Sequence, residues 1–228
     1  DHIQAYFEKY FSVQKPLDSQ KWLITAGPTY EAIDPVRFIG NHSSGKMGVA
    51  LAEHAAENGA EVFLISGPGT PKADHKFIQQ VYVQSAEEMY QACVVHFDAC
   101  DVAILAAAVA DYTPEIVADQ KIKKKAGDFS IDLKPAKDIL KHLGSVKTSQ
   151  KLIGFALETN NEIENAKKKI VSKNLDLVVL NSLQDAGAGF GYDTNKITLI
   201  DAQNNITTFE LKTKLKVAED IINAIIKL

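Results

Sequence analysis

The chain alternates between two kinds of hydrophobic pattern. Short apolar runs bounded by turn residues predict buried strands, and longer segments with apolar residues at helical spacing predict amphipathic helices. The predicted strands cover residues 22–26, 60–66, 77–83, 101–110, 151–157 and 176–182. The predicted helices cover residues 48–59, 85–97, 162–173 and 214–228. This alternation predicts an α/β protein with a mostly parallel sheet that is covered by helices on both faces.

Two segments interrupt the alternation. Within residues 112–135, KIKKK (121–125) and FSIDLK (129–134) flank AGD and predict an exposed hairpin arm that protrudes from the sheet. Residues 196–211 read as KITLID, a QNN turn and ITTFEL, which predict a second hairpin. We see no internal repeat and no low-complexity linker.

Ligands of open parallel sheets bind outside the carboxyl ends of the strands. This rule points to four segments, namely the loop after Ala26, SGPG after Ile65, AAAVADYTP after Leu105 and FALETNN after Gly154. All four contain small residues or polar ends, as a ligand-facing edge requires.

The first of these loops contains GNHSSGKMG (40–48), directly before a predicted helix. Its glycines and serines let backbone N–H groups approach an anion at the positive helix N-terminus. Gly40, Gly45 and Lys46 match the spacing of a phosphate-binding P-loop, but Met47 stands where that motif needs a hydroxyl for Mg²⁺. The dinucleotide fingerprint G-x-G-x-x-G is also absent after the first strand. The pattern leaves two readings open, an anion-binding loop and a plain Gly/Ser start of a helix.

Several charged residues each have a functional and a structural reading. Asp111 follows a strand end, where it is either a turn cap or a ligand of a metal–phosphate group. KIKKK is either a solvated charge run or a source of ammonium groups for a polyphosphate. Lys169 and Lys173 lie four apart on one helical face, as in a surface stripe, and Phe155 alone reads as core. Together, these residues support a nucleotide or a phosphorylated substrate that binds with a divalent ion.

Composition excludes several other classes. The chain has 228 residues, 46% of them hydrophobic, with a net charge of −4, and nothing in this balance calls for nucleic acid or an anionic membrane as a partner. No apolar run has the length of a membrane span. The start, DHIQAYFEKYF, lacks the pattern of a secretory signal and an initiator Met, so we expect a processed chain or part of a longer one. Cys93 and Cys100 match no zinc spacing and suit buried structural thiols in a reducing cytoplasm.

Six blocks of the sequence, in order, resemble phosphopantothenoylcysteine synthetase, a family of coenzyme A biosynthesis. They are ITAGPTYEAIDPVRFIGNHSSGKMG, AAAVADYTP, KIKKK, GFALETNN, KNLDLVVLN and FGYDTNKITLI, within Lys21 to Leu228. The chain looks most like the C-terminal half of bacterial bifunctional decarboxylase–synthetases. This resemblance implies a three-layer Rossmann-like (ribokinase-like) domain over residues 16–228, preceded by a connecting helix or tail over residues 1–15. It also implies no flavin in this chain, because the flavin-binding decarboxylase half is missing.

The resemblance implies a reaction in two steps. In this family, the carboxylate of 4′-phosphopantothenate attacks the α-phosphate of a nucleoside triphosphate, which gives an acyl-nucleotide and pyrophosphate. The amine of L-cysteine then displaces the nucleotide and forms an amide. Bacterial members that resemble this chain use CTP, and animal members use ATP. We therefore expect a CTP-using, Mg²⁺-dependent ligase that works as a cytoplasmic homodimer, fused to or associated with a decarboxylase.

The resemblance also implies roles for single residues. Asn41 matches the residue that holds the reacting carboxyl end and serves conversion of the acyl-nucleotide. Lys121 matches the lysine of the first step, where its charge stabilises the anion that develops on the α-phosphate. Arg37 matches an arginine that binds phosphopantothenate across a dimer interface. Ala107, Ala108 and Asp111 match the substrate segment, with Asp111 as the candidate metal ligand.

A larger set matches the nucleotide-binding positions of the family. These residues are Ser43, Ser44, Gly45, Leu105, Ala106, Ala107, Asp111, Lys121, Lys137, Asp138, Ile139, Leu140, Phe155, Lys169 and Lys173. The chain departs from the family at Lys137, where relatives often have Pro, and this departure bears on the choice of base.

The sequence has three alternative interpretations besides a CTP-using ligase. One is an ATP-using ligase of the same type. Another is a nicotinamide-dependent reductase, which lacks its glycine pattern here. The third is a non-catalytic assembly domain, which has no need of KIKKK, Asn41 and Asp111 together.

Overall fold

The computed structural model describes residues 15–124, 127–158, 160–182 and 191–228. The tail expected over residues 1–15 therefore lies, except for Lys15, outside the described residues. Within the described ranges, no helix combines the length and the apolar character needed to cross a bilayer.

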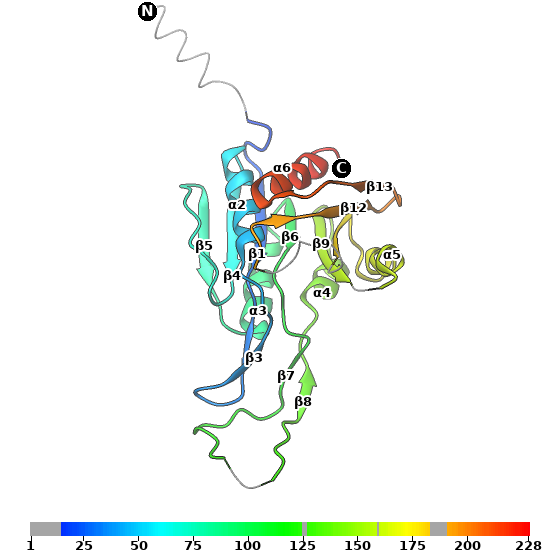
Figure 1. Cartoon of the computed structure of the whole chain (residues 1–228). Coiled ribbons are helices and arrows are strands. Elements are labelled where there is room, and N and C mark those ends of the chain that lie inside the picture. The colour runs from blue at the N-terminus through cyan, green and yellow to red at the C-terminus, as the bar shows by residue number, and fades with distance from the viewer. Residues whose placement is uncertain (1–14, 125–126, 159, 183–190) are drawn as a thin grey trace, which may run out of the picture.

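The central sheet has eight strands and confirms the predicted α/β class (Figure 1). Six parallel strands come first across the sheet: β5 (Ile78–Tyr82), β4 (Glu61–Ser66), β1 (Lys21–Ala26), β6 (Val102–Leu105), β9 (Lys151–Glu158) and β10 (Leu177–Ser182). Two antiparallel strands, β12 (Ile197–Asp201) and β13 (Ile206–Thr208), complete the edge next to β10. Counted along the chain, the parallel strands follow the order 3-2-1-4-5-6 of doubly wound sheets.

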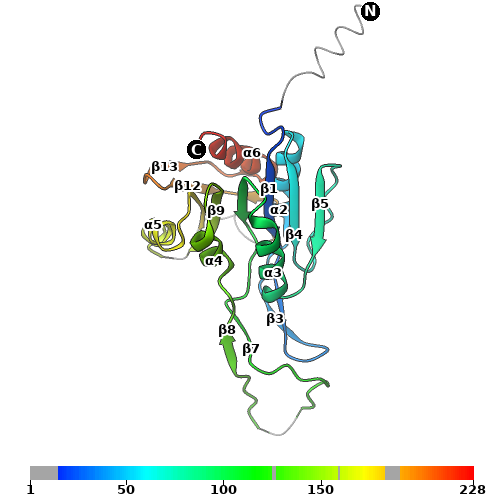
Figure 2. The ribbon, with the colours of Figure 1, turned by 180° about the vertical axis from the view of Figure 1, so that it is seen from behind.

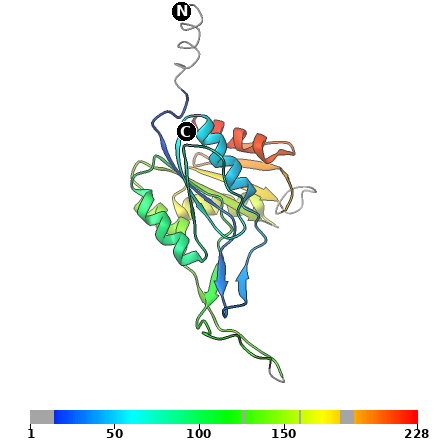
Figure 3. The same ribbon diagram turned by 90° about the vertical axis from the view of Figure 1, so that its left-hand side faces the viewer.

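Five helices in the described chain form the two outer layers (Figure 3). One face of the sheet is covered by α2 (Lys46–Glu57) and α6 (Lys214–Ile225). The other face is covered by α3 (Ala86–Phe97), α4 (Ile139–Val146) and α5 (Glu162–Lys173). Side chains of β1 show the alternation that this needs: Trp22 and Ile24 pack in the first layer, and Leu23 packs in the second.

The two cysteines lie in or next to the α3 layer. Both are buried and unpaired. Burial raises the pKa of the Cys93 thiol and of the Cys100 thiol to about 12. These are the properties expected of structural thiols rather than of nucleophiles.

Two small hairpins project beyond the carboxyl ends of the parallel strands (Figures 1 and 2). The first pairs β2 (Tyr30–Ala32) with β3 (Phe38–Gly40), and the sequence analysis missed it. The second pairs β7 (Tyr112–Pro114) with β8 (Leu133–Pro135), which confirms a protruding arm. Of the predicted strand positions in this arm, Leu133 and Lys134 do pair in β8, whereas residues 121–124 form no strand, because pairing is confined to the base of the arm. A run of lysines offers no apolar face that a neighbouring strand can cover.

Helix starts are fixed by local capping. The Ser85 hydroxyl accepts a hydrogen bond from Glu88 N at 3.2 Å, and Asp138 caps α4 through Lys141 N at 2.9 Å. Within the described chain, α2 and α5 lack such a side-chain cap, and the N-cap Gly45 of α2 has φ 72°. A Cβ at Gly45 would lie 2.6 Å from Thr70 Cγ2, so this position requires glycine on two grounds.

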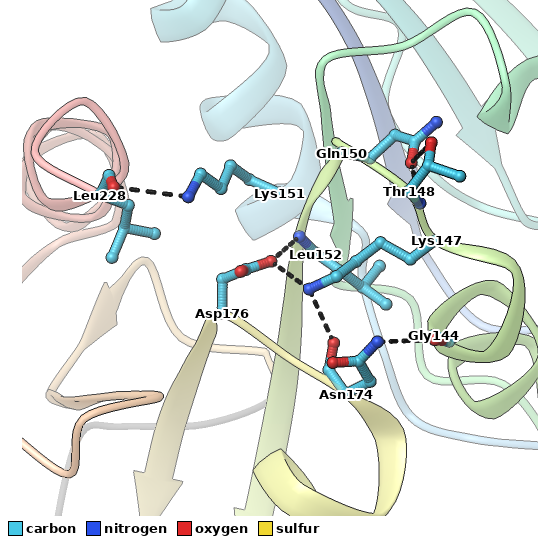
Figure 4. A network of polar contacts seen from close by, with 9 residues as sticks. All are labelled: Gly144, Lys147, Thr148, Gln150, Lys151, Leu152, Asn174, Asp176 and Leu228. Atoms are coloured by element: carbon cyan, nitrogen blue, oxygen red, sulfur yellow. Dashed lines mark hydrogen bonds and ion pairs between the residues drawn. The ribbon is translucent and has the colours of Figure 1, made fainter.

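A polar network locks the ends of α4 and α5 onto the sheet (Figure 4). Lys147 Nζ pairs with Asp176 Oδ2 at 2.8 Å, and Asp176 accepts a hydrogen bond from Leu152 N at 2.6 Å. Asn174 Nδ2 donates to Gly144 O at 2.9 Å. The two helices approach so closely that a Cβ at Gly144 would lie 1.9 Å from Lys173 O. This contact sets the position of the last turn of α5.

We expect Gly144→Ala to lower the free energy of unfolding by about 1–3 kcal/mol, because the added methyl group forces α4 away from α5. Helix propensity acts in the opposite direction, since alanine is favoured over glycine by about 1 kcal/mol. Urea denaturation of Gly144→Ala and of the neighbouring Ser145→Ala, a control at an exposed site, measures the effect. A Gly144→Ala protein as stable as the original would contradict the close contact.

Candidate active site

The candidate site lies where the direction of the chain across the sheet reverses. From β1 the chain proceeds to β4 and β5 on one side, and later returns to β6 on the other side. Ligands of doubly wound sheets bind in the crevice outside the carboxyl ends of two such strands. A cavity of about 150 Å³ lies there, between the loop before α2, the loop after β6 and the ends of β9 and β10.

Seven of the predicted site residues line this cavity. They are Ser43, Ser44, Gly45, Ala106, Ala107, Ala108 and Phe155. The structure thus brings together two of the loops that the sequence placed at one edge of the sheet. Phe155, which alone read as core, is half-buried and contributes to the wall.

Hydrogen bonds between the loops fix the shape of the cavity. Ala107 N donates to the buried Thr25 Oγ1 at 3.1 Å, and Ala108 N donates to Gly27 O at 2.8 Å. Asn41 Nδ2 donates to Ala108 O at 3.0 Å and to Val109 O at 3.2 Å. The amide of Asn41 therefore joins the anion loop to the loop after β6, beside the small residues of the cavity wall.

The first turn of α2 contributes backbone donors. Because no side chain caps this helix, its leading N–H groups remain available to an anion. Met47, the residue that breaks the P-loop pattern, packs against the hydrophobic core beneath. The loop therefore has the donors of an anion site without the hydroxyl that a P-loop uses to hold Mg²⁺.

A second group of predicted residues lies beside Phe155. Lys169 Nζ donates to Phe155 O at 2.7 Å, and Lys173 Nζ pairs with Asp138 Oδ2 at 2.8 Å. Burial and the nearby Lys173 ammonium lower the pKa of Lys169, while the carboxylates of Glu158, Asp138 and Asp111 oppose this shift. Lysines that looked like a surface stripe are thus part of a charged cluster at the side of the cavity.

The segment before α4 contributes less through its side chains than the resemblance implied. Lys137 Nζ bonds Glu87 at 2.7 Å and lies 4.5 Å from the centre of the Tyr90 ring, so its charge faces α3. Ile139 and Leu140 are buried in the core of the α3–α5 layer, and Leu105 packs against that core. The unusual lysine at position 137 therefore adds no charge to the cavity lining.

Arg37 and Lys121 also lie away from the cavity lining. Arg37 Nη2 bonds Asp34 Oδ2 at 2.5 Å and Ile122 O at 2.8 Å, so Arg37 lies beside the arm that carries Lys121. Asp34 also accepts a hydrogen bond from Ile122 N at 3.1 Å. Hydrogen bonding by the Arg37 guanidinium holds the pKa of Asp34 well below its usual range, although burial opposes the shift. The structure thus places Arg37 against the segment that carries Lys121.

The residues present fit a magnesium ion that arrives with a nucleotide. Across the described residues, no group of three or more His, Cys, Asp or Glu side chains forms a metal site. Asp111 is exposed, and its carboxylate lies close enough to Lys169 to affect the pKa of that lysine. Magnesium is commonly held by one or two carboxylates together with substrate phosphates and water.

Comparison with known proteins identifies the family. The DNA/pantothenate metabolism flavoprotein C-terminal domain family matches residues 17–228. The chain belongs to this family.

Three relatives of this flavoprotein C-terminal domain are informative. A cysteine/cysteine sulfinic acid decarboxylase from an unknown prokaryotic organism is 54% identical over 227 residues, which are 99% of this chain and 63% of that protein. The coenzyme A biosynthesis bifunctional protein CoaBC of Bacillus subtilis strain 168 is 45% identical over 227 residues, or 99% of this chain and 56% of that protein. The crystal structure of the C-terminal domain of a CoaBC protein has a TM-score of 0.79 and 41% identity, over 93% of this chain and 97% of that chain.

These relatives confirm the resemblance that the six sequence blocks carry. The chain spans 56–63% of the length of the two full-length relatives named. It spans nearly the whole of the crystallised C-terminal domain.

Four polar residues that line the cavity were not predicted from the sequence. They are Lys46, Asn181, Asn195 and Lys214. Asn195 Nδ2 donates to Asn181 Oδ1 at 3.0 Å, which joins the end of β10 to the short strand β11 (Thr194–Asn195). The rule of carboxyl ends, extended to the strand at 176–182, would have found Asn181. No sequence pattern indicated Lys214, because it is the first residue of α6, more than thirty residues after Asn181 in the chain.

We expect Lys169→Met to weaken nucleotide binding about ten- to hundredfold, because a hydrogen bond from a charged donor contributes about 1.5–3 kcal/mol. Isothermal titration calorimetry with CTP measures the effect. Lys168→Met is the matched control, since the exposed Lys168 pairs with Glu164 at 2.7 Å. Equal affinities of the two variants would contradict a role for Lys169 at the cavity.

Proposed function

We propose that the chain is a phosphopantothenate–cysteine ligase of coenzyme A biosynthesis. It activates 4′-phosphopantothenate with CTP, releases pyrophosphate, and couples the acyl-cytidylate to L-cysteine to give 4′-phosphopantothenoylcysteine and CMP. One observation carries the proposal: an uncapped helix N-terminus and a wall of small residues line a cavity at the switch point of the sheet, and Asn41 is bonded to that wall through Ala108 O. The likeness to the C-terminal domain of CoaBC, across nearly the whole of that domain, supports it.

The geometry supports a division of the cavity between the reactants. The backbone and hydroxyl donors of Ser43 to Gly45 hold nucleotide phosphate, and Ala106 to Ala108 leave room for the phosphate to approach. Asn41, fixed by two carbonyl groups, orients the carboxyl end of phosphopantothenate. Lys169, Lys173 and Asp138 hold the nucleoside at the side of Phe155. Asp111 would hold a magnesium ion that arrives with the triphosphate, and such an ion would neutralise part of the phosphate charge.

Arg37 and Lys121 complete the site in a homodimer. Both belong to the projecting hairpins and not to the cavity of their own chain. The hairpins carry large exposed apolar side chains, namely Val36, Phe38, Tyr112, Ile116, Phe129 and Leu133. An apolar surface of this kind is typical of a protein interface. We propose that this surface packs on a second copy of the chain and delivers Arg37 and Lys121 to the partner's cavity.

Other readings make different predictions. An ATP-using ligase would use the same site residues with a nucleotide that carries adenine in place of cytosine. An assembly domain releases no pyrophosphate. One relative is named as a cysteine/cysteine sulfinic acid decarboxylase, and decarboxylation of cysteine needs no nucleotide. The buried free thiols support a cytoplasmic location for the enzyme.

We expect pyrophosphate release when the chain is incubated with phosphopantothenate, L-cysteine, Mg²⁺ and CTP, at a higher rate than with ATP. Pyrophosphate is assayed by coupled spectrophotometry, and products of quenched mixtures are identified by mass spectrometry. Turnover with ATP at an equal or higher rate would overturn the preference for CTP. The ligase proposal would be overturned if no triphosphate gave pyrophosphate. It would also be overturned if the chain released carbon dioxide from cysteine without a nucleotide.

Two variants in the same assay separate the steps. Asn41→Asp is expected to accumulate acyl-cytidylate, because its charge repels the carboxyl end and removes a donor. Lys121→Gln is expected to form none. Accumulation in the lysine variant alone would reverse the two roles.

Mixing of inactive subunits tests the shared site. Because Arg37 lies against Ile122, next to Lys121, both residues are delivered by one subunit. Arg37→Ala mixed with Asn41→Asp is expected to regain about a quarter of the original activity, since half of the dimers are mixed and each mixed dimer has one intact site. Arg37→Ala mixed with Lys121→Gln is expected to regain none.

These mixtures are made after subunit exchange has been verified by mass spectrometry. Recovery in the second mixture would place Lys121 in the cavity of its own subunit. A monomer by light scattering, or no recovery in either mixture, would exclude the shared site.

A further inference from the structure

A second lysine cluster lies on the helices of the opposite layer from Lys169 and Lys173, since α2 and α6 cover one face of the sheet and α5 covers the other. Lys46 Nζ pairs with Asp193 Oδ1 at 2.6 Å, although the two residues are 147 positions apart. Lys214, only 8% exposed, donates through Nζ to Tyr192 O, and its backbone N donates to Asp193 O at 2.9 Å. The first residue of α2 and the first residue of α6 thus meet at one short segment.

Among the described residues, this cluster holds the ammonium groups of Lys46 and Lys214 and the carboxylate of Asp193. Burial lowers the pKa of Lys214, and the nearby Lys46 ammonium lowers it further, with Asp193 in opposition. Two cations held this close, one of them buried, cost free energy that a bound anion would offset.

The position of the cluster matches the tail of a triphosphate. Lys46 and Lys214 both line the main cavity, and both also line an adjoining hollow that continues toward Lys72 and Pro71. The anion loop Ser43 to Gly45, which directly precedes Lys46, lines the same cavity as this cluster and Phe155. A nucleotide with its nucleoside near Phe155 and its α-phosphate at the loop therefore extends its remaining phosphates toward the two lysines.

We propose that Lys46 and Lys214 form the subsite for the β- and γ-phosphates and for the pyrophosphate that leaves, and that Asp193 competes with these phosphates for Lys46. The proposal rests on the proposed function and adds residues to it. Asp193 pairs with Lys46 while the subsite is empty and gives up this pair when the triphosphate binds.

The subsite acts on the first chemical step. A carboxylate oxygen of phosphopantothenate forms a bond to the α-phosphorus, and the bond from that phosphorus to the bridging oxygen of the β-phosphate breaks. The electron pair remains on the bridging oxygen, so the negative charge of pyrophosphate increases as it leaves. Lys46 and Lys214 stabilise this charge. The return of Asp193 to Lys46 then favours release.

The test compares three ligands whose phosphates differ. Isothermal titration calorimetry with CTP, CMP and inorganic pyrophosphate, each with Mg²⁺, is run on the full chain. Lys46→Met and Lys214→Met are expected to weaken CTP and pyrophosphate about ten- to hundredfold and to leave CMP within about twofold. Asp193→Asn is expected to tighten CTP and pyrophosphate about three- to tenfold, because it removes the competing charge.

Matched controls exclude an effect of net charge. Lys216→Met and Asp220→Asn change the same charges on α6, where the two residues pair with Glu219 and Lys212 respectively, and neither lines the cavity. Both are expected to bind all three ligands as the original protein does. Lys46 and Asp193 are exposed, so we expect Lys46→Met and Asp193→Asn to fold. These two variants test the subsite even if Lys214→Met does not fold.

Three results would overturn the subsite. The first is that Asp193→Asn binds CTP and pyrophosphate with unchanged or lower affinity. The second is that the lysine variants lose affinity for CMP and for CTP equally. The third is that the original protein binds neither CTP nor pyrophosphate. Ligation is assayed separately on the original protein. Ligation without the expected binding pattern rejects the subsite alone, and the binding pattern without ligation rejects the proposed function alone.

Discussion

The close approach of loops at the carboxyl ends of β1 and β6 is the constraint on which the candidate site depends. Ala107 N reaches the buried Thr25 Oγ1 at 3.1 Å, and a Cβ at Gly48 would lie 2.5 Å from Ala26 Cβ. Side chains of any size at these positions would separate the loop after β6 and helix α2 from β1. Small residues thus bring backbone donors and Asn41 together around one cavity, where a strand-order reversal already leaves a crevice.

Charge around this cavity is arranged against the overall balance of the chain. The protein carries a net charge of −4, yet two lysine pairs flank the cavity, Lys169 with Lys173 and Lys46 with Lys214. Each pair has a carboxylate that partly offsets it, Asp138 on one side and Asp193 on the other. Such an arrangement suits a polyanionic ligand, because the phosphates replace or supplement carboxylates that are already in place.

The projecting hairpins pose a different physical problem. Asp34 fixes Arg37 and the backbone of Ile122, so the hairpin β2–β3 and the arm that carries Lys121 are held together. Their exposed apolar side chains are costly in water as long as nothing covers them. In the proposed two-fold dimer, the partner would cover these side chains and receive both basic residues at its cavity. The same hydrogen bonds then explain why the two residues are expected to act from one subunit.

The sequence by itself determined the α/β alternation, the helix that starts after Ser85 and the edge of the sheet at which the cavity lies. These follow from hydrophobic period, capping and strand direction, which are local properties. Only the tertiary structure decided which charges face the cavity. Lys137 turns to Glu87 and Tyr90, whereas Lys46 meets Asp193 and Lys214 from distant parts of the chain. The hairpin β2–β3 and its bond to the arm were equally hidden. Each of these depends on contacts between residues far apart in sequence, and no local period or spacing encodes such contacts.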